Sequence, residues 1–237
     1  MLENVACVLA ISIRSLIYLQ ALQNEGIAPQ FCFVLSEDKA ELYNKFHIDV
    51  VKKRYCYADL DATIGDALNA LNIPFEILGT RDINSEVVLR RIRQIPQKYI
   101  IYSGYGGCIL KKHLFEIDKQ WIHVHAGRLP AYRGSTTAYY SILNEKKISA
   151  TAIFMNVEID KGNIISSDDF DIPDEDVNID FLYEPYVRSK VLVKVLKQYE
   201  KSGKFDEYEQ ETSKAETYFI IHPVLKHIAL IGLNNNF

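Results

Sequence analysis

Residues 123–143 read HVHAGRLPAYRGSTTAYYSIL, and this stretch decides the fold and the candidate site. Two histidines, His123 and His125, stand at its start, just before a turn marked by glycine and proline. If they end a strand, both side chains project from the same face, because strand side chains alternate with a period of two. The spacing therefore predicts a metal clamp or a catalytic pair, unless it is accidental.

The chain on either side of this stretch alternates apolar runs with helical patterns. We expect strands over residues 5–10, 30–35, 75–78, 99–102, 150–157 and 164–172. We expect one helix from a cap at Ser12 to residue 24, and others over 59–71, 86–94, 136–143 and 178–201, with Pro185 in the first turn of the last one or kinking it. Solid apolar strands alternating with helices indicate an α/β fold, a Rossmann-like, mostly parallel twisted sheet with helices on both faces.

The overall charge and the cysteines exclude several classes of protein. A formal net charge of -4 lacks the strong positive field that nucleic acids or anionic membranes attract. The start of the chain has no pattern of a secretion signal, and no apolar run reaches the roughly 18 residues of a membrane helix. The four cysteines lack the close spacing of a zinc site, so we interpret them as reduced core or near-core residues of a cytoplasmic protein.

Three segments follow predicted strands, where open α/β sheets carry their sites. They are SGYGGCIL at 103–110, HVHAGRLPAYRG at 123–134 and VEIDKGNII at 157–165. The glycines of the first segment either cradle a ligand through the backbone or only permit a turn. Asp160 in the third segment, taken alone, also fits an ordinary turn.

Together these motifs resemble the folate-dependent formyltransferase family, which includes methionyl-tRNA, glycinamide ribonucleotide and sugar N-formyltransferases. The family pattern is Asn-x-His, then Leu-Pro-x-Tyr-Arg-Gly, then Asp-x-Gly-x-Ile. Here LPAYRG occupies residues 129–134, His125 matches the histidine, and Asp160 begins the last element. One departure is that His123 stands at the asparagine position. Another is that Ala126 and Gly127 stand where the family usually has a proline and then a serine or other small residue.

The resemblance implies transfer of a formyl group from 10-formyltetrahydrofolate to an amine, with no metal. Such a transfer needs a donor for a developing oxyanion and an acceptor for the amine's proton. We expect His125 to be the donor, and Asp160 to favour its charged form and to receive the proton. His123 either donates one hydrogen bond in place of the asparagine amide or is a structural replacement.

The resemblance also implies two sets of binding residues and a division of the chain. The folate-binding set is Gly107, Ile109, Leu110, Met155 and Glu158, and the substrate-binding set is Tyr132, Arg133, Gly134 and Thr136. For Arg133, anchoring of the loop is the stronger interpretation. We expect the catalytic domain over residues 1–202 and a C-terminal extension over 203–237 that packs on it as a strand and helix or as a hairpin.

Comparison with the family branches narrows the choice of acceptor amine. Methionyl-tRNA enzymes carry a basic C-terminal barrel, whereas the residues after the core helix here are acidic to neutral, which disfavours tRNA. Glycinamide ribonucleotide enzymes hold a phosphate on a glycine-containing loop after the first strand, and the corresponding LAISIRSL has no glycine. Formyltetrahydrofolate hydrolases have an extra N-terminal regulatory domain, for which we expect no room in this chain. What remains is the amino group of a nucleotide-linked sugar, a small-molecule substrate.

Two other functions stay open. One is a metal-dependent hydrolase in which His123, His125 and Asp160 bind the ion. The other is a catalytically impaired homologue that still binds folate or sugar, because His123 has replaced the asparagine. The apolar C-terminal segment, if exposed, favours a homodimer.

Overall fold

The structure, a computed structural model, describes residues 1–48, 57–173, 177–211, 213 and 215–234. These residues form two units. The first unit comprises residues 1–48, 58–123 and 155–157, and the second mainly residues 124–154 and those after 157. The expected boundary at residue 202 stays a prediction.

The first unit opens with the predicted strand–helix–strand motif, which is confirmed. Its elements are β1 (Leu2–Ala10), α1 (Ile13–Asn24) and β2 (Pro29–Leu35). The side chain of Ser12 accepts a hydrogen bond from the Ser15 N–H and so caps α1, as expected. Gly26, just past the helix, has a φ of +67°, which glycine adopts without strain.

The rest of this unit continues the alternation. It contains η1 (Lys39–Tyr43), α2 (Ile64–Ala70), β3 (Phe75–Ile77), α3 (Glu86–Gln94), β4 (Tyr99–Ser103), η2 (Lys112–Leu114) and β5 (Gln120–His125), whose last two residues belong to the second unit. The prediction that α2 starts at residue 59 was wrong. Thr63 and Asp66 form a capping box, in which each side chain bonds the other's backbone N–H, and this sets the helix start at residue 64.

The strands of the first unit lie in the order β3-β2-β1-β4-β5, and every pair is parallel. Residues 5–10 of β1 are buried on both faces, as strands covered by helices on both sides should be. On one face Val8 joins Val88 and Ile92 of α3 in one apolar cluster. The prediction of an α/β fold with a mostly parallel sheet is confirmed.

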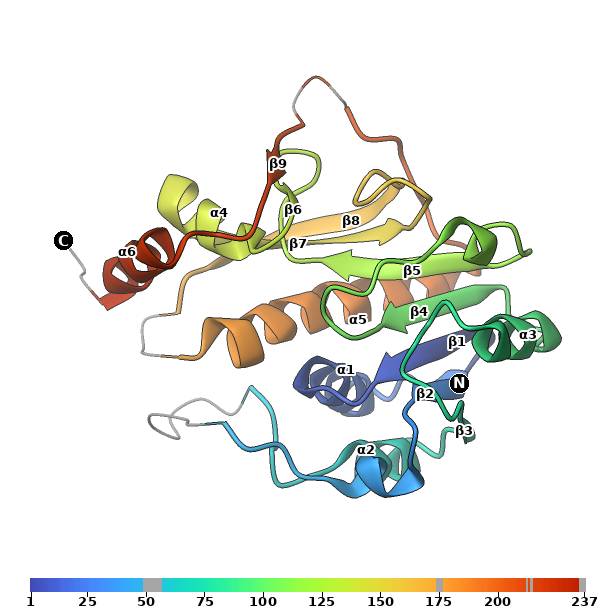
Figure 1. Ribbon diagram of the computed structural model, residues 1–237. Helices are drawn as coiled ribbons and strands as arrows, with labels where there is room; N and C mark the ends of the chain where they lie inside the picture. The colour runs from blue at the N-terminus through green and yellow to red at the C-terminus, as the bar shows by residue number, and fades with distance from the viewer. Residues whose placement is uncertain (49–56, 174–176, 212, 214, 235–237) are drawn as a thin grey trace. The chain divides into compact units, whose positions relative to one another are not determined.

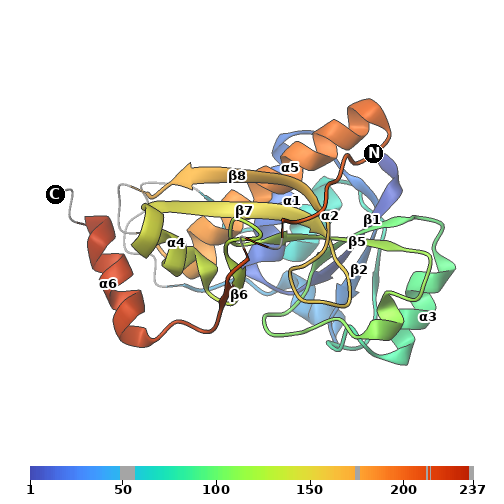
Figure 2. The same ribbon diagram turned by 90° about the horizontal axis from the view of Figure 1, so that it is seen from above.

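The second unit contains β6 (Arg133–Gly134), α4 (Thr137–Glu145), β7 (Lys147–Phe154), β8 (Ile164–Asp171), η3 (Ile179–Tyr183), α5 (Glu184–Ser202), β9 (Thr217–Tyr218) and α6 (Pro223–Asn234). Strands β7 and β8 lie side by side and pair antiparallel (Figures 1 and 2). The predicted position of β7 was three residues too late. Residues 155–157 lie beyond the strand, in the connection to β8.

The C-terminal part of the chain differs in detail from the expected single long helix over residues 178–201. A π-helical turn, η3, precedes α5, and Pro185 lies in the first turn of α5, where its missing N–H costs no helical hydrogen bond. The apolar segment of the extension forms β9 and α6, which confirms a strand and a helix rather than a hairpin. Strand β9 pairs parallel with β6 (Figure 1).

Three other expectations concern cysteines, membranes and the chain end. Cys7 and Cys32 are buried free thiols, but Cys108 is exposed, so its near-core interpretation was wrong; Cys56 lies outside the described residues. Among the described residues, none of the helices is both long and apolar enough for a membrane crossing. The frayed end expected from NNNF falls mostly outside the described residues.

Candidate active site

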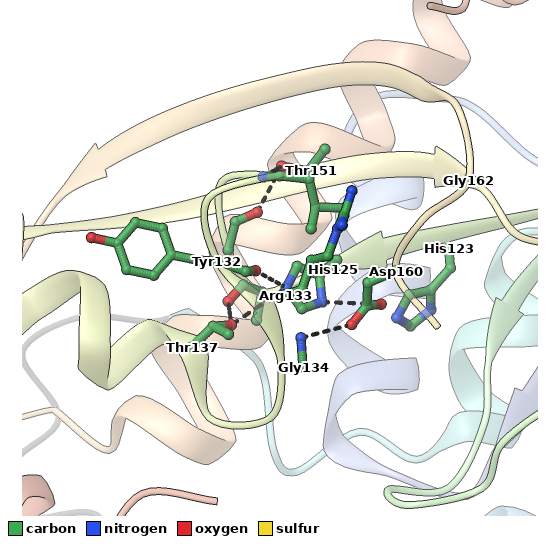
Figure 3. Close-up of polar contacts among 12 residues, drawn as sticks. His123, His125, Tyr132, Arg133, Gly134, Thr137, Thr151, Asp160 and Gly162 are labelled. Carbon is green, nitrogen blue, oxygen red and sulfur yellow. Dashed lines mark hydrogen bonds and ion pairs between the residues drawn. The ribbon is translucent and has the colours of Figure 1, made fainter. Parts of the chain in front are cut away.

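His125 is the last residue of β5, and its side chain is nearly buried (Figure 3). Its Nε2 lies 2.7 Å from the carbonyl oxygen of Tyr132. Because a carbonyl oxygen can only accept, Nε2 carries a hydrogen and donates it. This bond fixes the plane of the ring and leaves Nδ1 as the nitrogen that faces an acidic group.

That acidic group is Asp160, whose Oδ1 lies 3.4 Å from Nδ1 of His125 (Figure 3). The other carboxylate oxygen, Oδ2, accepts a hydrogen bond from the Gly134 N–H at 3.0 Å. The His125 and Asp160 side chains are only 6% and 11% exposed, so their attraction is weakly screened by water. The separation exceeds the usual limit of about 3.2 Å for an N–H···O bond, so the ring is not locked onto the carboxylate.

Asp160 lies in the turn that connects β7 to β8. Its φ is +55°, in the left-handed region, which aspartate tolerates better than most residues. The N–H of Lys161 donates to the Glu158 carbonyl at 3.3 Å within the same turn. Asp160 is therefore a turn residue by its backbone and a partner of His125 by its side chain, so the two interpretations of the sequence are both correct.

Gly127 explains one departure from the family pattern. A Cβ at this position would lie 2.9 Å from the Tyr132 carbonyl oxygen and 3.0 Å from Nε2 of His125, closer than real Cβ contacts. The same Cβ would lie 2.9 Å from Oγ1 of Thr137, which donates to the Ala126 carbonyl. A glycine here thus lets the bond between His125 and Tyr132 form.

The predicted substrate residues precede α4, and the side chains of three of them are engaged. The Tyr132 ring stacks on Tyr218 with 5.3 Å between centroids, and its hydroxyl donates to Glu145 at 2.7 Å. Arg133 is buried and donates to Oε1 of Gln210, as a loop anchor would. The backbone N–H of Gly134 bonds Asp160, and the hydroxyl of Thr136 donates to the Ser135 carbonyl. Contact of the four residues with an amine stays a prediction.

His123 lies two residues before His125 on the same strand, within the first unit. Its Nδ1 lies 3.3 Å from the Tyr102 carbonyl oxygen, so this nitrogen is the donor. The Tyr102 ring lies beside it, with 6.2 Å between ring centroids. Burial raises the pKa of the Tyr102 hydroxyl far above its usual value, so this neighbour stays uncharged.

Four of the predicted folate residues, Gly107, Ile109, Leu110 and Met155, belong to the first unit. Around Gly106 and Gly107 no atom lies within 4 Å of a Cβ built there, and Gly107 has a φ of +77°. Ile109 is 58% exposed, whereas Leu110 is buried. Met155 packs against the apolar cluster that contains Val8 and Val88. Contact of these four residues with folate stays a prediction.

Glu158, the remaining predicted folate residue, lies in the second unit. It is exposed and pairs with Lys161 at 2.6 Å. The hydrogen bond and charge of Lys161 lower the pKa of the Glu158 carboxyl. Its contact with folate stays a prediction.

Sequence reasoning missed the residues that hold the glycine loop. Nε of Arg14, in the first turn of α1, donates to Oγ of Ser103 at 3.2 Å, and its Nη2 donates to the Gly104 carbonyl. Oγ of Ser15 lies 3.0 Å from Oγ of Ser103. No local pattern distinguishes Arg14 from an ordinary surface arginine, because its partners come 89 and 90 residues later in the chain.

The alternative of a metal site finds no support in the described residues. They contain no group of three or more His, Cys, Asp or Glu side chains placed to hold an ion. Nε2 of His125 donates to the Tyr132 carbonyl, so this nitrogen offers no lone pair to an ion.

The nearly buried pair of His125 and Asp160 lies at the carboxyl end of a parallel strand, where open α/β sheets carry their active sites. The family model described as formyl transferase matches residues 34–184, more than half of the chain. The protein therefore belongs to the formyl transferase family.

Curated relatives and solved structures agree with this assignment. The methionyl-tRNA formyltransferase of Finegoldia magna is 27% identical over 204 residues, which cover 85% of this chain and 59% of the relative. The chain thus spans less than two thirds of that relative's length. The methionyl-tRNA formyltransferase of Alkaliphilus oremlandii is 37% identical over 110 residues, 45% of this chain and 34% of the relative.

Two solved structures share the fold. WlaRD, a sugar 3N-formyl transferase crystallised with dTDP and 5-N-formyl-THF, aligns with a TM-score of 0.62 at 18% identity, covering 99% of this chain and 80% of that one. An N-formyltransferase from Helicobacter canadensis, in complex with folinic acid and dTDP-3-aminofucose, aligns with a TM-score of 0.61 at 18% identity, covering 98% and 80%. At this identity the likeness concerns the fold alone.

Proposed function

We propose that the protein is an N-formyltransferase that moves the formyl group of 10-formyltetrahydrofolate to a primary amine. The observation that carries the proposal is the contact between His125 and Asp160. Both side chains are bonded to the LPAYRG loop, His125 to the Tyr132 carbonyl and Asp160 to the Gly134 N–H. Membership of the formyl transferase family supports it.

The chemistry assigns a different task to each member of the pair. In the transfer, a bond forms between the amine nitrogen and the formyl carbon, and the bond from that carbon to the folate nitrogen breaks. The amine loses one proton and the departing nitrogen gains one. Asp160 is the acceptor for the amine's proton, and Nδ1–H of the protonated His125 ring is the donor toward the formyl oxygen.

The co-substrate 10-formyltetrahydrofolate supplies the formyl group. We assign its binding to Gly107, Ile109, Leu110, Met155 and Glu158, and the strongest support comes from the exposed Ile109 and the open backbone at Gly107. Arg14 contributes by holding the loop that carries these glycines.

For the acceptor we propose the amino group of a nucleotide-linked sugar. WlaRD and the Helicobacter canadensis enzyme, whose structures contain dTDP or dTDP-3-aminofucose, share the fold of this chain. The net charge of -4 also supports a small acceptor over a polyanion.

The test is a transfer assay with purified protein, 10-formyltetrahydrofolate and a panel of dTDP-linked 3-amino and 4-amino sugars. We expect release of tetrahydrofolate together with an acceptor whose mass grows by one CO unit. His125→Ala protein is the matched control for uncatalysed transfer. The absence of product across amino sugars and simpler amines would contradict the proposal.

A second candidate acceptor is methionyl-tRNA, because the curated relatives are methionyl-tRNA formyltransferases. The same assay with charged initiator tRNA decides between the two. Formylation of the tRNA but not of the sugars would replace our proposed acceptor and leave the reaction class intact. A homodimer and a cytoplasmic location stay predictions, which light scattering and cell fractionation test.

A further inference from the structure

Gln210 lies in the extended segment after α5, far in sequence from the motifs of the site. The segment is held beside the start of β8, because Tyr208 and Ile164 exchange two backbone hydrogen bonds of 2.8 and 2.9 Å. The Gln210 side chain is half-buried and reaches both the Asp160 turn and the LPAYRG loop.

The amide of Gln210 uses both of its ends. Its Nε2 donates to the carbonyl oxygens of Asp160 and Gly162, at 2.9 and 2.7 Å. Its Oε1 accepts two bonds from the guanidinium of buried Arg133, at 3.2 and 2.7 Å. The side chain therefore joins the turn that carries Asp160 to the loop that carries Gly134.

These contacts bear directly on the carboxylate of Asp160. Asp160 has a φ of +55°, in the left-handed region, and the two bonds from Gln210 to carbonyls of this turn favour that conformation. Gly134, next to Arg133, donates its N–H to the Asp160 carboxylate. One glutamine thus bonds both the turn that carries the Asp160 carboxylate and the loop whose Gly134 N–H donates to that carboxylate.

We propose that Gln210 is a positioning residue for Asp160, which it orients toward His125 without touching the reacting atoms. This inference rests on the proposed formyl transfer for its kinetic consequence, but its structural consequence can be measured separately. Residues beyond the family motifs are thereby part of the catalytic arrangement.

The most discriminating variant is Gln210→Glu. A glutamate keeps the acceptor for Arg133 but replaces the amide donor with an oxygen that repels the carbonyls of Asp160 and Gly162. Gln210→Met, of similar length, removes all four bonds and serves as the second variant. Melting curves show whether each variant is folded under the assay conditions.

Gln20→Glu is the matched control. Gln20 also donates through Nε2 to a backbone carbonyl, that of Asp59 at 2.8 Å, and accepts through Oε1 from the Asp59 N–H at 3.0 Å. It lies in the first unit and has no place in the proposed site. The control therefore reports the cost of the same chemical change without displacement of Asp160.

We expect Gln210→Glu to lower kcat about 10- to 100-fold, because small misplacement of a catalytic group has effects of this size. The KM for 10-formyltetrahydrofolate should stay unchanged, and Gln20→Glu should match the wild type. Gln210→Met should also lower kcat. Wild-type kcat in folded Gln210→Glu, or a loss equal to that of Gln20→Glu, would overturn the inference.

The second measurement does not need turnover. The imidazole ¹H–¹⁵N signals of His125, assigned with His125→Ala protein, should move in Gln210→Glu and not in Gln20→Glu. If wild-type protein formylates no amine, the proposed function fails, and these signals alone decide the inference. Unmoved His125 signals in Gln210→Glu would then refute it.

Discussion

The two histidines of β5 have the same residue type on the same strand, yet their surroundings differ. His125 is 5% exposed, donates through Nε2 to Tyr132 and turns Nδ1 toward the Asp160 carboxylate. His123 is half-buried and uses Nδ1 to donate to a strand carbonyl of Tyr102. A carboxylate can exchange a proton with a neighbouring imidazole, whereas the carbonyl oxygen beside Nδ1 of His123 can only accept a hydrogen bond.

The difference teaches that the spacing of the pair did not define its chemistry. Period-two spacing places two side chains on the same face, but the partners of each ring come from other segments of the chain. We therefore expect the two positions to respond very differently to substitution, and the following variants test that contrast.

The largest effect is expected from His125→Ala. Removal of a donor to a developing oxyanion costs about 10²- to 10³-fold in rate, so kcat for formyl transfer should fall by a factor in this range. The measurement is steady-state transfer with the best amine of the panel. Asp160→Asn, which keeps the size of the side chain and its acceptor for Gly134, should lose a similar amount. A fully active His125→Ala protein would remove the basis for the proposed roles.

Gly127→Ala should come next. Its methyl group would press on the Tyr132 carbonyl and on Nε2 of His125, so the ring must move. Overpacking of this kind costs about 1–3 kcal/mol of stability, and the displaced ring should lower kcat about 10-fold or more. Melting temperature and kcat are measured together. A variant with both values unchanged would show that the His125–Tyr132 bond is not needed.

His123→Asn should have a smaller effect. It restores the residue of the family pattern, and an amide N–H can donate from a similar place, so activity should stay within about tenfold of the wild type. His123→Ala, which removes the donor, separates contact with the reacting group from a structural role. If it leaves both kcat and formyl donor affinity intact, His123 is only a structural replacement.

The smallest effect is expected in the glycine loop. Gly107 has a φ of +77°, so Gly107→Ala should cost about 1 kcal/mol or more of stability. Gly106 lacks this angle and has open space around it, so Gly106→Ala should leave the melting temperature unchanged. Calorimetry with 5-formyltetrahydrofolate then separates the two interpretations of the loop. Weaker binding by Gly106→Ala means that the backbone contacts the ligand, and unchanged binding means that the glycines serve the turn.

Most elements of the fold were predictable because their signals are local. The cap at Ser12, the helix over residues 86–94 and the proline at the start of α5 all act within one helical turn. The start of α2 was placed too early because charged and apolar residues before Thr63 continue a helical pattern, and the capping box overrules it.

The candidate site was predictable only in part. His125 and Asp160 were identified by a family pattern, and the structure brings their side chains together. The need for glycine at 127 arises from the approach of a carbonyl five residues later and a threonine ten residues later, which propensity cannot reveal. Arg133 was ambiguous in sequence because a buried arginine and a substrate-binding arginine look alike until the partner is known.

By itself the sequence determined the order of the elements, the mostly parallel sheet and the motifs of the formyl transferase family. These follow from hydrophobic periodicity and turn residues, which act over a few positions. Only the tertiary structure decided which nitrogen of His125 is engaged and that Gln210 joins the Asp160 turn to Arg133. The reason is that these bonds link residues 7 to 77 positions apart, and their geometry exists only after the chain has packed.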